Sequence, residues 1–142
     1  MAGTEYLDHL ASIRLFSSCN RKELTKIAKS TDELEVKAGK VLTDEGKSGR
    51  EAFIIVEGEA IVEVGGHEVA RLGPGQQFGE LALLDGGPRT ATVKAATDMT
   101  LLVISQRAFF SLLDDVPGLA RKLLTSMARI IRDLDAKLPM TH

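Results

Sequence analysis

The sequence predicts an α+β domain in which an antiparallel β-barrel or jelly roll is flanked by N-terminal and C-terminal helices. Eleven of the thirteen glycines lie between positions 39 and 87, where they separate short apolar runs. Many short strands joined by glycine turns are typical of antiparallel barrels and jelly rolls. The segments before and after this region have the apolar spacing of helices, and no helical segments alternate with the strands, which excludes a parallel α/β sheet.

Length and composition fit one ordinary globular domain, residues 1–142. Hydrophobic residues make up 44% of the chain and charged residues 27%. A net charge of −2 argues against general nucleic-acid binding. The single cysteine, Cys19, cannot form an internal disulfide. We find no signal-peptide pattern and no apolar run of membrane-spanning length, so we expect no membrane contact and a cytoplasmic location.

Residues 1–33 are expected to form the N-terminal helices. Asn20, followed by Glu23 three positions later, resembles a capping box, in which each residue satisfies a backbone donor of the other. Apolar residues then recur at helical spacing, at Leu24, Ile27 and Ala28.

Residues 34–105 are expected to form the β-barrel. Glycine tolerates the positive φ angles of tight turns, so Gly65 and Gly66 predict a hairpin between two of the strands. The strand-like runs are 34–37, 40–42, 52–56, 60–64, 67–72, 91–95 and 100–104.

Residues 106–138 are expected to form the C-terminal helices. The first covers 106–113, and Pro117 suits the first turn of a second, longer helix. In that helix apolar residues alternate spacings of four and three, as in a coiled-coil seam. A homodimer through this helix is therefore possible, although the same stripe could pack on its own barrel. The stripe consists of Ala120, Leu124, Met127, Ile131, Leu134 and Leu138, widened by Leu123 and Ile130.

The segment 78–92 carries the chemistry. A short helix opening at Gly79 would direct free backbone N–H groups to one point, which is the arrangement of an anion site. Arg89 can add a bidentate, charge-assisted contact to the same anion. Glu80 cannot bind an anion, but its carboxylate can accept hydrogen bonds from hydroxyl groups. Phosphate and hydroxyl groups together indicate a sugar phosphate.

This segment, Phe78-Gly-Glu-Leu-Ala-Leu-Leu followed by Pro88-Arg-Thr-Ala-Thr-Val-Lys-Ala, resembles the phosphate-binding cassette of the cyclic nucleotide-binding domains. That family includes kinase regulatory subunits, nucleotide-gated channels and bacterial regulators of the catabolite-activator type. Gly46, the run 53–58 and the run 72–75 also fall where the family places its glycines. The resemblance implies a receptor for cAMP or cGMP, with no other cofactor.

The resemblance also implies a role for each site residue. Glu80 would accept the ribose 2′-hydroxyl, Arg89 would bind an exocyclic phosphate oxygen, and Gly79 would let the backbone approach the sugar. Apolar contacts to the base would come from Val62, Ala70 and Leu72. The backbone N–H groups that complete the anion site would belong to Leu81, Ala82 and Thr90.

Two questions stay open at this point. A hydroxyl at Thr90 can reach the exocyclic amine of guanine, yet relatives with a hydroxyl there can respond to cAMP; the likeness of the C-terminal part to the bacterial regulators favours cAMP. Glu80 could instead be a first-turn acid stabilised by the helix dipole, with Arg89 as its structural ion-pair partner.

The function classes considered differ in what they require. A non-enzymatic receptor would transmit binding through its C-terminal helix to an unknown effector. A cupin-like metal enzyme would need clustered histidines, and His67 is the only histidine within the strand region. A third class is an assembly module that binds no nucleotide. The sequence ends at His142 with no recognition helix after the last predicted helix, so we expect no direct binding of nucleic acid.

Overall fold

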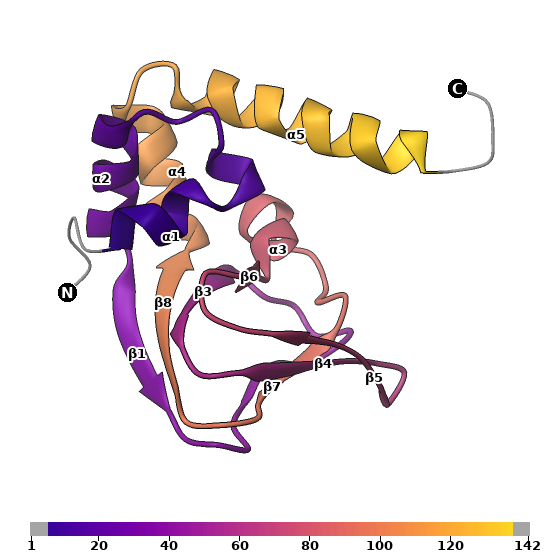
Figure 1. Cartoon of the computed structure of the whole chain (residues 1–142). Coiled ribbons are helices and arrows are strands. Elements are labelled where there is room, and N and C mark those ends of the chain that lie inside the picture. The colour runs from indigo at the N-terminus through magenta and orange to yellow at the C-terminus, as the bar shows by residue number, and fades with distance from the viewer. Residues whose placement is uncertain (1–5, 138–142) are drawn as a thin grey trace.

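Helices and sheets occupy two different parts of the protein in the computed structural model, which describes residues 6–137. Figure 1 shows the N-terminal and C-terminal helices together at the top and the β-sheets below them. The N-terminal and C-terminal helices are therefore neighbours in space, with η2 against α5. Across residues 6–137, none of the helices combines the length and apolar character that a membrane span requires.

The N-terminal part consists of three short helical elements: α1 (Leu7–Ala11), the 3-10 helix η2 (Arg14–Phe16) and α2 (Arg21–Lys29). The predicted capping box is confirmed at the start of α2. The backbone N–H of Glu23 donates to the side chain of Asn20 at 2.9 Å, and the backbone N–H of Asn20 donates to the Glu23 carboxylate at 2.8 Å. This cap fixes where α2 begins and turns its apolar face, including Leu24 and Ile27, toward the core.

The strands form two antiparallel four-stranded sheets. The first sheet has the order β1 (Asp32–Val36), β8 (Met99–Ser105), β3 (Glu51–Glu57) and β6 (Gln77–Phe78). The second has the order β2 (Val41–Thr43), β7 (Thr92–Ala95), β4 (Ala60–Val64) and β5 (His67–Leu72). The jelly-roll prediction is confirmed in this form, as two facing sheets and not as one closed barrel.

The hairpin prediction is also confirmed. β4 and β5 pair antiparallel, and the turn between them contains Gly65 and Gly66 with φ angles of 59° and 81°. The two-residue strand β6 was not expected from the sequence. It pairs with β3, where Phe53 lies opposite Phe78, and it leads directly into the segment predicted to bind an anion.

Two clusters of buried side chains hold these layers together. β3 is buried on both faces, which explains its continuous apolar run. Phe53, Ile55 and Leu101 pack between the two sheets. Ile54 and Leu102, on the opposite face, pack against the helices. Fully burying one such side chain stabilises the fold by about 1.5–3 kcal/mol. Because β3 and β8 contribute side chains to both clusters, they connect the helical part to the space between the sheets.

The C-terminal part contains α4 (Gln106–Asp115) and α5 (Leu119–Ala136). The prediction that Pro117 lies in the first turn of the second helix is wrong. α5 begins after Gly118, whose φ angle of 80° is left-handed and breaks the chain away from α4 before the helix starts. Pro117 therefore belongs to the linker between α4 and α5.

The apolar stripe of α5 divides into a packed part and an exposed part. Leu119 and Leu123 are buried against the other helices. Leu124, Ile131 and Leu134 are 64%, 56% and 58% exposed. Figure 1 shows that α5 extends sideways beyond the other helices. The last member of the predicted stripe, Leu138, lies outside the described residues.

Candidate ligand-binding site

The segment after β6 turns sharply into a short helix. Gly79 has a φ angle of 82° and precedes α3 (Glu80–Asp85). The first backbone N–H groups of a helix have no partner within its hydrogen-bond ladder, so those that follow Glu80 in α3 are available to an anion. A Cβ at Gly79 would lie 2.8 Å from Nη1 of Arg89 and 2.9 Å from the carbonyl oxygen of Glu51. The position requires glycine because the Arg89 side chain packs against it.

Arg89 is a buried cation, with a relative exposure of 8%. Its Nη1 donates to the backbone carbonyl of Glu51 at 2.8 Å, and its Nη2 lies 3.9 Å from the Glu51 carboxylate. Its guanidinium carbon lies 5.8 Å from the centre of the Phe53 ring. Burial lowers the pKa of this guanidinium and the Glu51 carboxylate opposes the shift. Arginine remains charged under any ordinary condition, so the site holds a fixed positive charge.

The backbone around Arg89 is also fixed, by the loop that follows β2. The Arg89 N–H donates to the Lys47 carbonyl at 2.8 Å, and the Gly46 N–H donates to the Arg89 carbonyl at 2.9 Å. Gly49 packs directly on the guanidinium, because a Cβ there would lie 2.0 Å from Nε of Arg89. A second glycine therefore makes room for the same side chain. Its role was not recognised from the sequence.

Glu80 is the first residue of α3 and is partly buried. Burial raises the pKa of its carboxyl group, while hydrogen bonds from the Gln77 side chain and from its own backbone N–H act in the opposite direction. The alternative of a structural ion pair between Glu80 and Arg89 is not what the structure shows, since the carboxylate beside Arg89 is that of Glu51.

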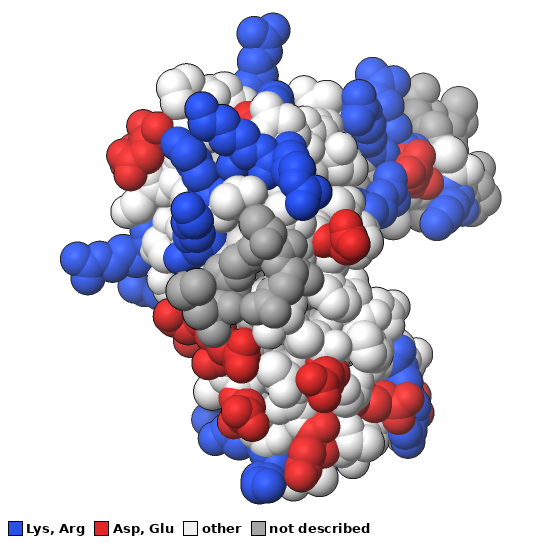
Figure 2. Space-filling model, turned by 60° about the vertical axis from the view of Figure 1, so that its left-hand side comes forward, with Lys and Arg blue, Asp and Glu red and all other residues white. Residues whose placement is uncertain are grey.

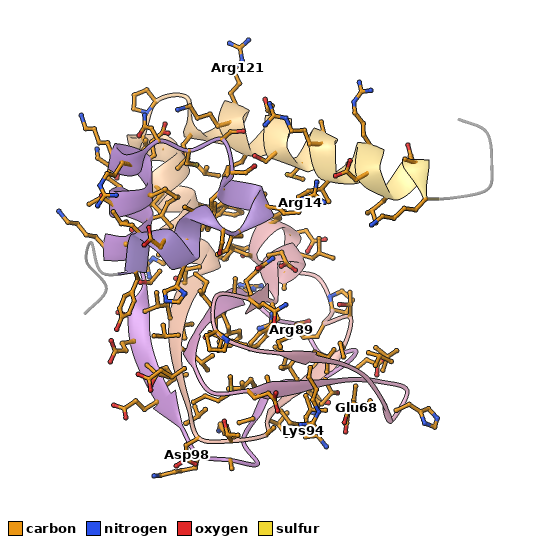
Figure 3. All side chains as sticks on the ribbon, viewed as in Figure 1. Arg14, Glu68, Arg89, Lys94, Asp98 and Arg121 are labelled. Carbon is orange, nitrogen blue, oxygen red and sulfur yellow. The ribbon has the colours of Figure 1, made fainter. Side chains whose placement is uncertain are left out.

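A cavity of about 260 Å³ lies between the second sheet and this segment. Figure 3 shows Arg89 at the same place, between α3 and the strands. The cavity is lined by seven of the nine residues expected to bind the ligand: Val62, Ala70, Leu72, Gly79, Glu80, Arg89 and Thr90. The other two, Leu81 and Ala82, line a small adjoining pocket with Gly79, Glu80, Arg89 and Thr90. All nine therefore meet at one place.

The cavity has distinct polar and apolar sides. Glu80 and Arg89 come from the segment 78–92, and Val62, Ala70 and Leu72 come from β4 and β5. Four lining residues were not expected from the sequence: Thr43, Phe78, Ala91 and Val93. Phe78 and Ala91 belong to the recognised segment and could have been named on that ground. Thr43 comes from β2, where its hydroxyl donates to the Ala91 carbonyl at 3.0 Å.

A second, larger cavity of about 400 Å³ lies on the other side of Glu80, between η2, α3 and α5. Its wall is mainly apolar, with Leu81 and Leu84 from α3 facing Ile131 and Leu134 from α5. Glu80 lines both cavities. Within residues 6–137, no group of three or more His, Cys, Asp or Glu side chains is placed to hold a metal ion.

These features define a class of protein. It is a jelly-roll domain with a cavity that is lined by a buried cation, the start of a helix and an apolar wall. The family model described as "Cyclic nucleotide-binding domain" matches residues 33–116. The chain belongs to this family.

Comparison with known proteins gives the same family. The chain is 40% identical over 126 residues to a cAMP-dependent protein kinase regulatory subunit of Mycosarcoma maydis, covering 82% of this chain and 24% of that one. It is 37% identical to a cyclic nucleotide-gated potassium channel of Rhizobium etli, covering 80% and 32%. The N-terminal domain of a transcriptional regulator from Streptomyces coelicolor superposes with a TM-score of 0.81 at 29% identity, covering 92% and 94%. The chain thus spans about a quarter to a third of the first two relatives.

Proposed function

We propose that this domain is a non-enzymatic receptor for cyclic nucleotides that favours cAMP over cGMP and transmits binding through its C-terminal helix. The observation that carries the proposal is that Arg89, Glu80 and the start of α3 converge on one cavity. A buried guanidinium beside free backbone N–H groups suits a cyclic phosphate. A carboxylate next to it suits the ribose hydroxyl.

The other side of the cavity suits the base. Val62, Ala70 and Leu72 offer apolar surface from the β4–β5 hairpin. Thr90 is exposed at the edge of the cavity, where its hydroxyl could meet a guanine amine. The preference for cAMP is supported by the name of the kinase regulatory subunit that this chain resembles.

Transmission to α5 is supported by the position of Glu80. A ligand that binds Glu80 changes one wall of the larger cavity, whose other wall is α5. The ligand then shifts the position of α5 by its different affinity for the two arrangements. The output would pass to an effector protein or to a second copy of the chain. We also propose a cytoplasmic location, where the free thiol of Cys19 remains reduced.

Calorimetric titration with cAMP, cGMP and 5′-AMP tests the receptor. We expect cAMP to bind more tightly than cGMP, and 5′-AMP to bind weakly because its phosphate is not cyclic. At about 100 times the dissociation constant, cAMP should stabilise the fold by about 2.7 kcal/mol, seen as a higher melting temperature. Absence of binding for both cyclic nucleotides would leave the assembly module as the function.

A homodimer through α5 is tested separately by sedimentation. Leu124 and Ile131 are exposed on one side of α5, so Leu124→Asp with Ile131→Asp should convert a dimer to a monomer. Thr125→Asp, at an exposed position on another side of the helix, is the control. A parent protein that sediments as a monomer at all concentrations would exclude the dimer and leave the receptor proposal intact.

A further inference from the structure

The charges of the chain are divided between its two parts. Residues 32–105 carry seven Lys and Arg against thirteen Asp and Glu, whereas the helical residues 6–31 and 106–137 carry eleven against six. Figure 2 shows the consequence on one face of the molecule, where most blue side chains gather in the upper half and most red ones in the lower half. The near-neutral net charge therefore conceals a basic helical surface.

Four of the nine residues of α2 are Lys or Arg. Lys22, Lys26 and Lys29 follow one another at spacings of four and three, which places them on one face of the helix, and all three are exposed. We call these three residues the lysine face. Like charges at such spacings destabilise a helix. Lys26 and Lys29 lie in the last turn of α2, where the helix dipole offsets part of this repulsion.

Neighbouring acids do not neutralise the lysine face. The one acid of α2, Glu23, is buried and accepts a hydrogen bond from Lys122 of α5 at 2.7 Å. Although burial opposes ionisation, this bond and the one from the Asn20 backbone hold the pKa of Glu23 below its usual value. No ion pair between two residues of the range 6–137 includes a member of the lysine face.

A cleft of about 170 Å³ adjoins the lysine face, between the start of α2 and the linker from α4 to α5. Lys22 and Lys26 form its basic side, and Val116 and Pro117 form its apolar side. Asn20 and Glu23 complete the lining, and the Glu23 carboxylate is paired with Lys122. The cleft can hold one apolar side chain while both ammonium groups contact acidic groups beside it. Because it combines a cleft with charged groups, this site is better suited to bind an extended peptide than to bind a flat charged surface.

We propose that the lysine face and its cleft bind an acidic segment of a partner protein that carries an apolar anchor residue. A membrane is a poorer fit, because α2 offers no large apolar side chain among the exposed ones of the described chain, so nothing would insert beside the lysines. A nucleic acid is a poorer fit because the thirteen acids of the sheet region would repel a long polyanion.

The test uses a fluorescent peptide of Asp and Glu with one central Leu, and the same peptide with Ser in place of Leu. We expect salt-dependent binding, with the Leu peptide several-fold tighter than the Ser peptide. The combined change Lys22→Glu, Lys26→Glu and Lys29→Glu should weaken binding about tenfold or more, and the three Lys→Arg changes should preserve it. Melting curves show whether each variant is folded.

The matched control reverses three exposed lysines of the sheet region, with Lys37→Glu, Lys40→Glu and Lys47→Glu, and should leave binding within about twofold. Equal losses in the control and the test variant would overturn the site. Equal binding of the two peptides would overturn the cleft. Tighter binding to phosphatidylserine vesicles or to duplex DNA than to the peptide would overturn the choice of partner.

Discussion

Residues 78–92 and the helix α5 are both attached to the jelly roll, but by different kinds of contact. In the first region a buried guanidinium is fixed by the Glu51 carbonyl at 2.8 Å and enclosed by Gly49 and Gly79. Beyond its first turns, α5 has exposed polar contacts, such as the ion pair between Arg14 and Asp133, whose side chains are 54% and 56% exposed. Figure 3 shows Arg14 beneath α5.

This difference fits the proposed receptor, in which residues 78–92 would bind the ligand and α5 would transmit binding. Buried contacts with many partners are costly to break, so the arginine and its glycines form one rigid unit. Exposed ion pairs contribute about 0–1 kcal/mol each, so the second half of α5 gains little stability from such pairs, whereas Leu119 and Leu123 anchor its start. Under the proposed function, the binding site would stay fixed while α5 changes its position.

The strongest challenge to the rigid region is Arg89→Ala. We expect cAMP affinity to fall by about 2–4 kcal/mol, because the change removes one side of a desolvated charge pair with the phosphate. Calorimetry measures the loss. Arg121→Ala removes an exposed arginine that points away from the protein in Figure 3, and it should leave affinity unchanged. Unchanged affinity in Arg89→Ala would remove the site.

Gly49→Ala tests whether the enclosure of Arg89 matters. The added Cβ would lie 2.0 Å from Nε, so either the arginine or the loop must move. We expect the free energy of unfolding to fall by about 1–3 kcal/mol and cAMP affinity to fall with it. Gly73→Ala is the matched control, because a Cβ there meets nothing within 4 Å. Two variants of equal stability and affinity would contradict the enclosure.

The pH dependence of binding examines Glu80. Burial raises its pKa, so the carboxylate is lost on acidification at a higher pH than for a free glutamate near 4.5. We expect cAMP affinity to fall by up to about tenfold per pH unit below the raised pKa, and Glu80→Gln to remove this dependence. The stability of the ligand-free protein should change with pH in the opposite direction to the affinity. Because the pKa of Glu80 is raised in the folded state, its contribution to the free energy of unfolding is present at low pH and is lost as pH rises through the raised pKa. Calorimetry and melts across this range check both signs.

The smallest effect is expected at α5. Arg14→Ala should lower the free energy of unfolding by only about 0.2–1 kcal/mol, since the pair with Asp133 is exposed. Hydrogen exchange provides a local measurement: amides in the second half of α5 should exchange faster, and those of residues 78–92 should not change. Equal acceleration in both regions would mean that they form one cooperative unit.

Contacts between residues close in the sequence could be predicted, whereas contacts between distant segments could not. The segment 78–92 was recognisable because Gly79, Glu80 and Arg89 lie in one continuous stretch of sequence that resembles a family cassette. The partners of Arg89 were not recognisable. Glu51 and Phe53 are brought to it by the pairing of β3 with β6, a strand of only two residues with too little pattern to detect.

The helices show the same limit. The capping box at Asn20 was predictable because it depends on residues three positions apart. The burial of α5 was not, because an apolar stripe does not say which of its residues meet the same chain. Leu123 is buried by contacts with distant segments, whereas its neighbour Leu124 is 64% exposed. The expected role for Gly79 in approaching the sugar stays a prediction, and the structure adds its contact with Arg89.

The contact between Arg89 and the Glu51 carbonyl lowers the entropy cost of binding an anion. Immobilising a long side chain on binding costs about 0.5–1.5 kcal/mol of entropy. Here that freedom is already lost when the domain folds, because the guanidinium is aligned and confined before any ligand arrives. An incoming anion meets a preorganised cation. Under the proposed function, the ligand and α5 are the parts that would still lose freedom on binding.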